Sequence, residues 1–269
     1  MWYNMLSVQY TIQRTKGHIM LGRDAPHSII DTHCHIIPGV DDGSRSMQET
    51  LKMLTIASDE GISDMIATPH YKRDHRNIST AGISEKLEQI SELEKEIGLN
   101  VKLHAGEEIY YFSDLSEALR NGQVATMPDG GHVLIEFSPM ENYIVIRNAM
   151  DGILSSGYTP ILAHIERYEC IVRDDDAAFD LKNMGVEVQV NASSITGAAG
   201  AATKRFTAGL LRNRLIDFIG TDSHGARERT PEIRKCAKLI HKKCDREYAD
   251  SILFGRAYEE LLAYKALTR

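Results

Sequence analysis

An alternation of short β-rich runs with longer amphipathic stretches is the feature that most constrains the fold of this chain. From residue 28 onward, Gly, Pro, Asn or Asp bound these runs in the way expected of strands. Seven runs are predicted as strands, at residues 28–32, 64–68, 101–105, 133–137, 160–164, 186–190 and 215–220. Because strands that alternate with helices build parallel sheets, the pattern predicts an α/β fold.

The stretches between the runs have helical periodicity. Helices are predicted at residues 47–60, 83–97, 144–155, 177–184 and 203–212, and two more follow the last strand at 233–243 and 249–267. Seven βα units that close on themselves form a TIM-barrel-like (β/α)7 barrel, and an open doubly wound sheet is the alternative. No GxGxxG or GxxxxGK[ST] loop is present to support nucleotide binding by an open sheet, so the barrel is favoured.

Composition and length limit the class of protein. The chain has 269 residues, 42% of them hydrophobic, and residues 28–269 are predicted as a single domain. Residues 1–27 are polar and weakly periodic, and are interpreted either as a disordered N-terminal extension or as an addition upstream of the native start. The net charge of −7, with scattered basic residues, argues against a nucleic-acid partner.

The four cysteines contain no CxxC pair and follow no secretory leader. They are therefore interpreted as reduced thiols of a cytoplasmic protein. No stretch approaches the roughly 20 apolar residues that span a bilayer, so direct membrane insertion is not expected.

Polar residues recur at the carboxyl ends of the predicted strands. In order, the ends read DTHCH, ATPH, HAGEE, LIEF, AHIER, VQVNA and GTDSH, and six of the seven contain His, Asp or Glu. In an α/β barrel these ends face one mouth, so side chains that are far apart in the sequence converge there. The pattern predicts one shared site.

The spacing within two of these ends suits metal binding. His33 and His35 are separated by one residue, as are Asp222 and His224, and this spacing places both side chains on one face of a strand. A single HxH is also explained by two polar side chains on a half-buried strand. Its repetition as DxH, with single ligand candidates at the intervening ends, favours a metal site for Mn²⁺, Fe or Zn²⁺.

These residues resemble the polymerase-and-histidinol-phosphatase (PHP) metallohydrolases, and most closely their bacterial manganese-dependent protein-tyrosine phosphatase branch, which is associated with capsule and exopolysaccharide control. The resemblance runs from about Ile29 to Leu262 and rests on the motifs DTHCHIIPGVDDG, ATPH, GEEI, LIEF, AHIER and TDSH. It implies a distorted (β/α)7 barrel with a metal site of two or three ions, most often Mn²⁺. Ile165 is a departure, because the family usually has Pro there.

The resemblance also implies a ligand for each motif. One ion would be held by His33, His35, Glu108 and Asp222, a second by Glu108, Glu136 and His164, and a third by Asp42, His70 and His224. Glu107 aligns outside the ligand set. Asp31 and Asp41 are expected to orient histidines, a role that metal sites commonly require.

Two arginines match family positions that bind the phosphoryl group. These are Arg167 and Arg229, and Arg227 competes with Arg229 for the role. Three divalent ions would bring +6 and four carboxylate ligands −4, which leaves about +2 to attract a phosphate dianion. A water molecule on such ions has a lowered pKa, so the expected reaction is attack of a metal-bound hydroxide on phosphorus.

Several residues receive a structural interpretation. A cysteine-dependent tyrosine phosphatase needs an arginine six positions after its cysteine, and none of the four cysteines has one. Cys34 is interpreted as a core residue, and His18, His27, His132 and His241 as solvent-exposed. The loop YKRDHRN at residues 71–77 either guides an acidic phosphopeptide or is simply solvated.

The resemblance alone supplies the expected substrate. It implies a phosphotyrosine protein, namely a membrane-associated bacterial tyrosine kinase of capsular or exopolysaccharide biosynthesis. A small-molecule phosphatase of the histidinol-phosphate type would use the same ligands, and a non-catalytic metal-binding barrel is a third alternative. The oligomeric state is not predicted.

Overall fold

The structure is a computed structural model that describes residues 14–15, 18–19, 28–174 and 176–263. Most of the predicted extension, residues 1–27, lies outside the described residues, as do His27 and the end of the last predicted helix. Within the extension, two short strands pair antiparallel, β1 (Arg14–Thr15) and β2 (His18–Ile19).

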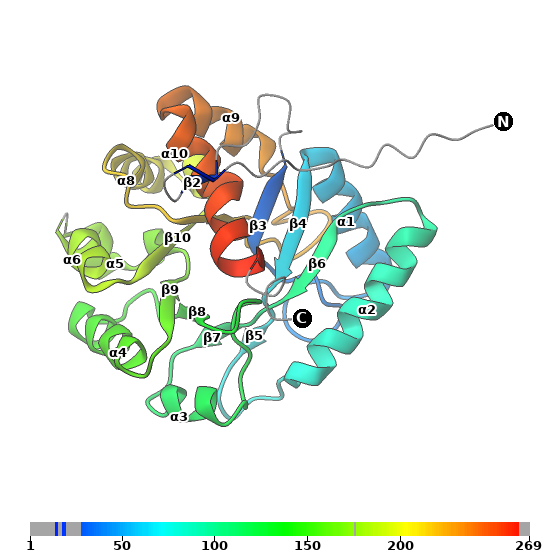
Figure 1. The fold of residues 1–269 in the computed structure, drawn as a ribbon, viewed down its shortest axis with the longest axis horizontal. Coiled ribbons are helices and arrows are strands. Elements are labelled where there is room, and N and C mark those ends of the chain that lie inside the picture. The colour runs from blue at the N-terminus through cyan, green and yellow to red at the C-terminus, as the bar shows by residue number, and fades with distance from the viewer. Residues whose placement is uncertain (1–13, 16–17, 20–27, 175, 264–269) are drawn as a thin grey trace.

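The remaining strands form two parallel sheets that curl around a common axis (Figure 1). The strands are β3 (Ile29–Cys34), β4 (Ile62–Ala67), β5 (His70–Tyr71), β6 (Lys102–Ala105), β7 (Glu108–Tyr110), β8 (His132–Glu136), β9 (Thr159–Leu162), β10 (Glu187–Asn191) and β11 (Phe218–Gly220). One sheet has the order β3-β4-β6 and the other β11-β10-β9-β8-β7-β5.

The first and last barrel strands meet at a seam. Asp222 N–H donates to His33 O at 2.8 Å, His35 N–H donates to Ser223 O at 2.9 Å, and Cys34 forms a parallel bridge with Ser223. All seven predicted strands are present, and the prediction of a distorted (β/α)7 barrel is confirmed.

Two of the predicted strands are each followed by a short second strand that the sequence did not predict. After a two-residue interruption, β5 follows β4 and β7 follows β6, and the two short strands pair with each other through His70 and Glu108. A Cβ on Gly106, at the second interruption, would lie 2.9 Å from Ile66 Cγ2, so a larger residue would not fit at this bend.

The last predicted strand begins three residues later than expected, at Phe218. Ahead of it, the backbone of Ile216 both donates to and accepts from the Tyr248 hydroxyl, at 3.2 and 3.1 Å. These bonds satisfy the Ile216 backbone in place of a sheet ladder.

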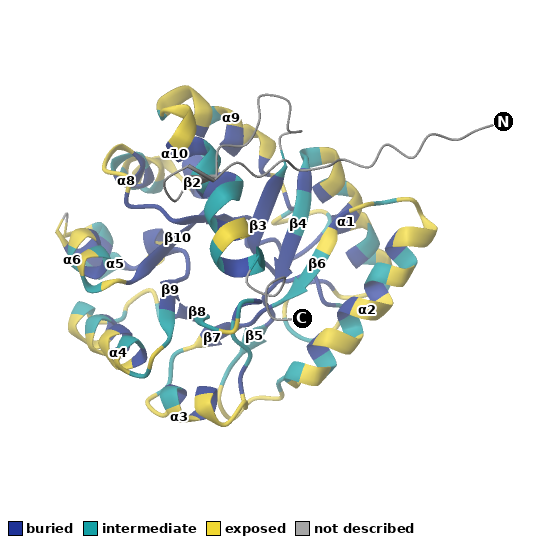
Figure 2. Ribbon diagram, viewed as in Figure 1, coloured by how far each residue is buried: buried dark blue, intermediate teal, exposed yellow. Residues whose placement is uncertain are grey.

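Helices cover the outside of the barrel. They are α1 (Met47–Glu60), α2 (Thr80–Glu96), α3 (Leu115–Arg120), α4 (Tyr143–Ser155), α5 (Glu169–Val172), α6 (Ala177–Met184), α7 (Ala192–Thr196), α8 (Ala201–Arg212), α9 (Arg234–Lys243) and α10 (Arg246–Asp250), with a 3₁₀ turn η1 (Ile165–Arg167) and two π-helical segments η2 (Ser251–Gly255) and η3 (Ala257–Leu262). In Figure 2 the strands are mostly buried and the outer faces of the helices exposed. None of the described helices is both long and apolar enough to cross a membrane.

The start of α1 shows how the sequence sets a helix boundary. Ser46 caps the helix by accepting from Glu49 N–H, and Gly61 ends it with a φ of 88°. Met53, Leu54 and Ala57 are buried on the inner face. The helix therefore packs on the sheet and returns the chain to β4.

The C-terminal segment closes one end of the barrel. Ala257 and Leu261 of η3 pack against inward-facing residues of several strands, among them Ile30, Leu134 and Phe218. Figure 1 shows this red segment inside the ring of strands. It covers the amino ends of the strands, so the opposite, carboxyl ends remain for a site.

Candidate metal centre

The carboxyl ends of the strands bring the nine predicted ligand residues into one cluster. They are His33 and His35 from β3, Asp42 from the following loop, His70 from β5, Glu108 from β7, Glu136 from β8, His164 after β9, and Asp222 and His224 after β11. Only Asp42 is exposed, and the others are buried or half-buried.

The first predicted group has the dimensions of a single coordination sphere. His33 Nε2 lies 3.2 Å from His35 Nε2, and Glu108 Oε2 lies 3.1 and 3.2 Å from these two atoms. Asp222 Oδ1 completes the group at 3.7 and 3.5 Å from the same nitrogens. Ligands at about 2.0–2.2 Å from a tetrahedral ion lie roughly 3.3–3.6 Å apart. The two imidazole nitrogens and the Glu108 oxygen have close to this spacing, and Asp222 Oδ1 lies beside both nitrogens.

The second predicted group is arranged around two carboxylates. His164 Nε2 lies 2.7 Å from Glu108 Oε1 and 3.9 Å from Glu136 Oε2. His70 Nδ1 also faces this group, at 3.1 Å from Glu108 Oε2 and 3.2 Å from Glu136 Oε1. Glu108 therefore faces both groups, in the position expected of a bridging carboxylate.

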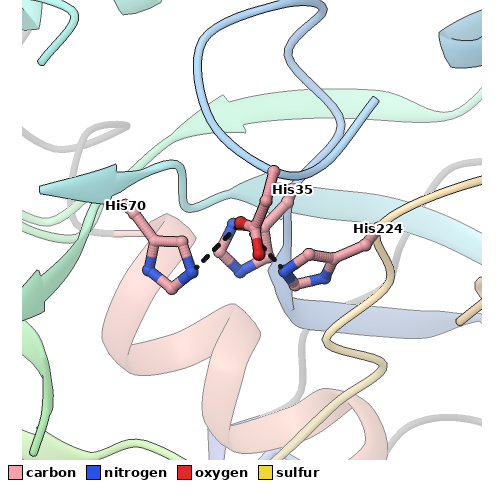
Figure 3. A group of neighbouring side chains, drawn as sticks. His35, His70 and His224 are labelled. Atoms are coloured by element: carbon pink, nitrogen blue, oxygen red, sulfur yellow. Dashed lines mark ion pairs between the residues drawn. The ribbon is translucent and has the colours of Figure 1, made fainter. Parts of the chain in front are cut away.

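The third predicted group lies at the edge of the cluster. Asp42 Oδ1 is 3.4 Å from His70 Nε2 and 3.5 Å from His224 Nε2. Figure 3 shows the imidazole of His35 between those of His70 and His224. His70 thus presents one ring nitrogen to the second group and the other to the third, a dual position that the sequence did not predict.

Hydrogen bonds at Nδ1 turn Nε2 of three histidines into the cluster. His35 Nδ1 lies 2.8 Å from Asp41 Oδ2, as predicted for Asp41, and His224 Nδ1 lies 3.0 Å from the carbonyl oxygen of Asp222. His33 Nδ1 lies 3.3 Å from Gln189 Oε1. An acceptor at Nδ1 holds the proton there and leaves a lone pair on Nε2, as a metal ligand requires.

Gln189 and Asn191 are supporting residues that the sequence did not identify. Gln189 Oε1 also accepts from His164 N–H at 2.6 Å, and Gln189 Nε2 donates to Asn191 Oδ1 at 2.9 Å. Asn191 Nδ2 in turn donates to Asp222 Oδ2 at 2.9 Å. These amides link His33 to Asp222, and their only signal in the sequence was the polar strand end VQVNA.

Asp31 supports His33 through the backbone rather than through the imidazole ring. Its carboxylate accepts from Thr221 N–H at 2.8 Å, from the Thr221 hydroxyl at 2.5 Å and from the backbone N–H of His33 at 3.3 Å. It therefore fastens β3 to the end of β11, and it fixes His33 through the backbone.

Two glycines allow the histidines of β3 to take their places. A Cβ on Gly43 would lie 2.3 Å from His35 O, and a Cβ on Gly220 would lie 2.5 Å from His33 Cβ. Both distances are far below contact distance, so a larger residue at either position would displace a proposed ligand.

Unpaired buried atoms indicate that these residues suit cations. Three buried atoms have no hydrogen-bond partner among the described residues: His70 Nδ1, Glu108 Oε2 and Glu136 Oε1. The two carboxylate oxygens lie 3.1 and 3.2 Å from the His70 nitrogen. Burying polar atoms without partners is costly. A divalent ion between them would satisfy all three, so the residues present fit a metal.

The pKa shifts in the cluster reflect its dense mixture of carboxylates and imidazoles. Burial opposes the charge of Glu108, but His33 and the hydrogen bond from His164 hold its pKa well below the usual range. Burial and the neighbouring His35 lower the pKa of His224 to about 4. The same carboxylates raise the pKa values of His33 and His35, and raise that of His70 to about 9, so binding of an ion would displace protons from these imidazoles.

Three site residues have a backbone conformation that side chains rarely adopt. His164, Asp222 and Arg229 have φ values of 33°, 53° and 48°. Such strain is found mostly at functional sites, where the surrounding structure holds it in place. At His164 the left-handed turn also ends β9, two residues before the predicted strand end.

Both predicted arginines reach the mouth of the site. Arg167 donates to Oδ2 of Asp222, and Arg229 forms an ion pair with the other oxygen, Oδ1, at 2.8 Å from Nη2. Their side chains are 41% and 45% exposed, so they remain accessible to an anion entering from solvent. Of the two candidates in this loop, Arg229 makes the contact with Asp222.

Three other predictions have clear outcomes. Cys34 is fully buried in the core, as expected. Glu107 accepts from Ala125 N–H at 2.8 Å and is absent from the ligand groups, also as expected. The interpretation of His132 as solvent-exposed was wrong: its side chain is only 14% exposed, because Glu187 and Glu260 lie over it.

Two cavities flank the cluster. One of about 310 Å³ lies beside Arg167 and includes Glu166 and Asn191 in its lining. The other has a volume of about 440 Å³, and its lining residues come shortly after His70 and Glu108 in the sequence. They are Lys72, Arg73, His75, Tyr110, Tyr111 and Phe112. The second contains the basic residues of the loop at 71–77.

Comparison with known proteins gives consistent similarities. The model of the family described as capsular polysaccharide synthesis, CpsB/CapC, matches residues 29–262. The tyrosine-protein phosphatase CpsB of Streptococcus pneumoniae is 30% identical over 220 residues, which cover 80% of this chain and 90% of that protein. The tyrosine-protein phosphatase YwqE of Bacillus subtilis is 29% identical over 220 residues, covering 80% and 85% of the two chains.

A solved structure is similar over nearly the same range. It belongs to a study of YwqE from B. subtilis and CpsB from S. pneumoniae, described as metal-dependent tyrosine phosphatases. The TM-score is 0.81 at 25% sequence identity, and the match covers 88% of this chain and 95% of that one.

Proposed function

Because this chain belongs to the CpsB/CapC family of capsular polysaccharide synthesis, we propose that it is a metal-dependent phosphatase that hydrolyses phosphotyrosine on a protein. The observation that carries the proposal is the convergence of nine ligand-type side chains with two arginines at one barrel mouth. This arrangement supplies both a place for cations and groups that bind an anion.

The nine residues are proposed to hold two or three divalent ions, with Mn²⁺ favoured over Fe and Zn²⁺. Imidazole nitrogens and carboxylate oxygens, without thiolates, suit these metals. When bound, the ions would supply Lewis-acid stabilisation of the phosphoryl group and lower the pKa of water to make a nucleophile. Asp41, Gln189 and the Asp222 carbonyl would keep three Nε2 lone pairs directed at the ions.

Arg167 and Arg229 are proposed to bind the phosphoryl oxygens. Both guanidinium groups already pair with a carboxylate at the mouth, and a planar guanidinium fork matches the geometry of a phosphate. Their positive charge would favour the developing negative charge on the transferred group. They would also orient the ester, so that its phosphorus faces the floor of the site.

The substrate proposed for this site is a phosphotyrosine of a membrane-associated bacterial tyrosine kinase that acts in capsule or exopolysaccharide biosynthesis. The capsular family and the tyrosine phosphatases among its relatives support this substrate. A cytoplasmic location is proposed with it, and the four free cysteines support that location.

Comparing two substrates tests the activity. With Mn²⁺ present, we expect hydrolysis of a phosphotyrosine peptide with a kcat/KM well above that for histidinol phosphate. Selective hydrolysis of histidinol phosphate would replace the proposed substrate with a small molecule. Turnover of neither, by folded protein with full metal content, would favour a non-catalytic barrel.

Two variants separate the proposed roles. Asp222→Ala should lower metal content and activity together, because Asp222 completes the first group. Arg167→Ala should retain the metal but lose phosphotyrosine turnover. An unchanged kcat/KM in Arg167→Ala would remove Arg167 from the mechanism.

A further inference from the structure

A second cluster of metal-ligand side chains lies at the opposite end of the barrel. His132 begins β8, Glu187 begins β10, and Glu260 lies on η3, which closes this end (Figure 1). Their ligand atoms all lie within 4.8 Å of one another. Glu136, in the metal centre, is at the other end of β8, roughly 13 Å away at about 3.3 Å per residue. The two clusters are therefore separate.

The histidine of this cluster is held as a metal ligand is held. His132 Nδ1 lies 2.8 Å from Asp129 Oδ2, and Asp129 is itself fixed by accepting from the backbone N–H groups of Gly131 and His132. A carboxylate at Nδ1 holds a proton there, as in carboxylate–histidine–metal arrangements, so an ion would bind at Nε2. That Nε2 points at Glu187 Oε2, at 3.3 Å, and Glu260 Oε2 lies 4.0 Å away.

One carboxylate oxygen in the cluster is buried without a partner. Glu187 is only 5% exposed, and its Oε2 has no hydrogen bond within the described part of the chain. Its other oxygen accepts from Arg256 at 2.6 Å. The unpaired oxygen is the one that faces His132, so it points into the cluster.

The surrounding charges leave room for a cation. Four carboxylates, those of Asp129, Glu187, Asp217 and Glu260, contribute −4, while Arg256 and Lys182 contribute +2, so the net charge is −2 before any proton on His132 is counted. One divalent ion would neutralise this charge.

We propose that His132, Glu187 and Glu260 form a second metal site, for a Zn²⁺-like divalent ion that fastens the C-terminal segment to the barrel. One nitrogen and two carboxylate oxygens suit Zn²⁺, with water completing the coordination. The ligands come from β8, β10 and η3, so the ion would join the closing segment to two strand starts. Its role would be structural, because the site is remote from the phosphoryl-binding arginines.

Zinc stoichiometry of the full-length protein tests the site. Metal-free protein would be loaded with Zn²⁺, separated from free ions and analysed for zinc, as wild type and as His132→Gln and Glu260→Gln. We expect each variant to lose one equivalent per chain and to retain the kcat for a phosphotyrosine peptide with Mn²⁺. His104→Gln is the matched control, because His104 pairs with Asp64 at 2.8 Å but belongs to none of the ligand groups.

Thermal unfolding gives an independent measurement. Zn²⁺ should raise the Tm of Asp222→Ala, whose metal centre is impaired, and this rise should be lost in Asp222→Ala/His132→Gln. Glu260 is partly exposed, so Glu260→Gln remains informative if a variant at His132 does not fold. Equal zinc content in wild type and both variants, or a Tm response that persists without His132, would overturn the proposal and leave the cluster as an ion-pair network.

Discussion

At the scale of single residues, the candidate metal centre depends on side chains that do not touch a metal. Asp41 and Gln189 fix the rings of His35 and His33, while Asp31 fixes the backbone between β3 and β11. Ligand types and spacing can be found in a sequence because HxH and DxH recur at strand ends. A neutral glutamine leaves no such mark, since its role depends on a neighbour 156 positions away.

Gln189 provides a test of this support. Gln189→Met is nearly isosteric but lacks the acceptor for His33 Nδ1–H, so Nε2 of His33 would no longer be held toward the cluster. We expect metal affinity and kcat/KM to fall about 10- to 100-fold, as is usual for residues that orient metal ligands. Gln89→Met, on the exposed face of α2, is the control and should change neither quantity.

The buried carboxyl group of Glu107 should make the unfolding free energy depend on pH. Burial raises its pKa from an ordinary value of 4.5 to about 8. The folded protein therefore binds a proton at Glu107 that the unfolded chain releases, and the unfolding free energy should fall as pH rises from about 4.5 to 8. Each pKa unit corresponds to about 1.4 kcal/mol, so the effect can reach a few kcal/mol.

Glu107→Gln measures this contribution directly. Glutamine resembles the protonated carboxyl and cannot titrate, so urea unfolding of the variant should depend less on pH between 5 and 8. The unfolding free energy of the variant minus that of wild type should therefore be larger at pH 8 than at pH 5. Parallel pH profiles for the two proteins would contradict the protonated state of Glu107.

At the scale of elements, strand existence was predictable and strand detail was not. Each predicted strand formed, because alternating apolar runs bounded by turn residues have few other solutions. The short strands β5 and β7 were not predicted, and the bend before β7 depends on close packing at Gly106. His132 was misjudged because its cover comes from η3, more than a hundred residues later in the chain.

The basic loop after β5 is the element most suited to substrate selection. Lys72 lies over the Tyr110 ring and Arg73 over the Phe112 ring, at 5.9 and 5.1 Å, beside the 440 Å³ cavity. Exposed charges of this kind attract acidic segments at low ionic strength. The loop is therefore suited to residues that flank a phosphotyrosine.

Removing both charges tests this interpretation of the loop. Lys72→Ala/Arg73→Ala should raise KM for an acid-flanked phosphotyrosine peptide by up to about 30-fold, since each of the two exposed pairs contributes about 0.2–1 kcal/mol. The kcat should be unchanged and the effect should fade at high salt. Lys242→Ala/Lys243→Ala, at the end of α9, removes the same charge and serves as control. An equal rise in KM for an alanine-flanked peptide would argue against charge recognition.

At the scale of the whole molecule, the two ends of the barrel have different tasks. The carboxyl ends hold the candidate metal centre, and the amino ends are closed by η2 and η3. Leu261 is fully buried among inward-facing strand residues, whereas Tyr258 on the same segment is 40% exposed. Closure should therefore contribute to stability without entering the chemistry.

Leu261→Ala tests this separation of tasks. We expect the unfolding free energy to fall by about 2–5 kcal/mol, as is usual when a buried leucine is truncated. The kcat of the folded protein should be unchanged. Tyr258→Ala should cost much less stability, and a loss of kcat in fully folded Leu261→Ala would show that the two ends are coupled.

The seam between β3 and β11 has a consequence for how the protein matures in the cell. Thr32 and Ile219, joined across this seam, are 187 positions apart, and the first ligand group draws His33 and His35 from one side and Asp222 from the other. A nascent chain that is still on the ribosome, with Asp222 not yet emerged, lacks part of this group. The proposed ligand set is therefore completed only after Asp222 has emerged, late in the synthesis of the chain.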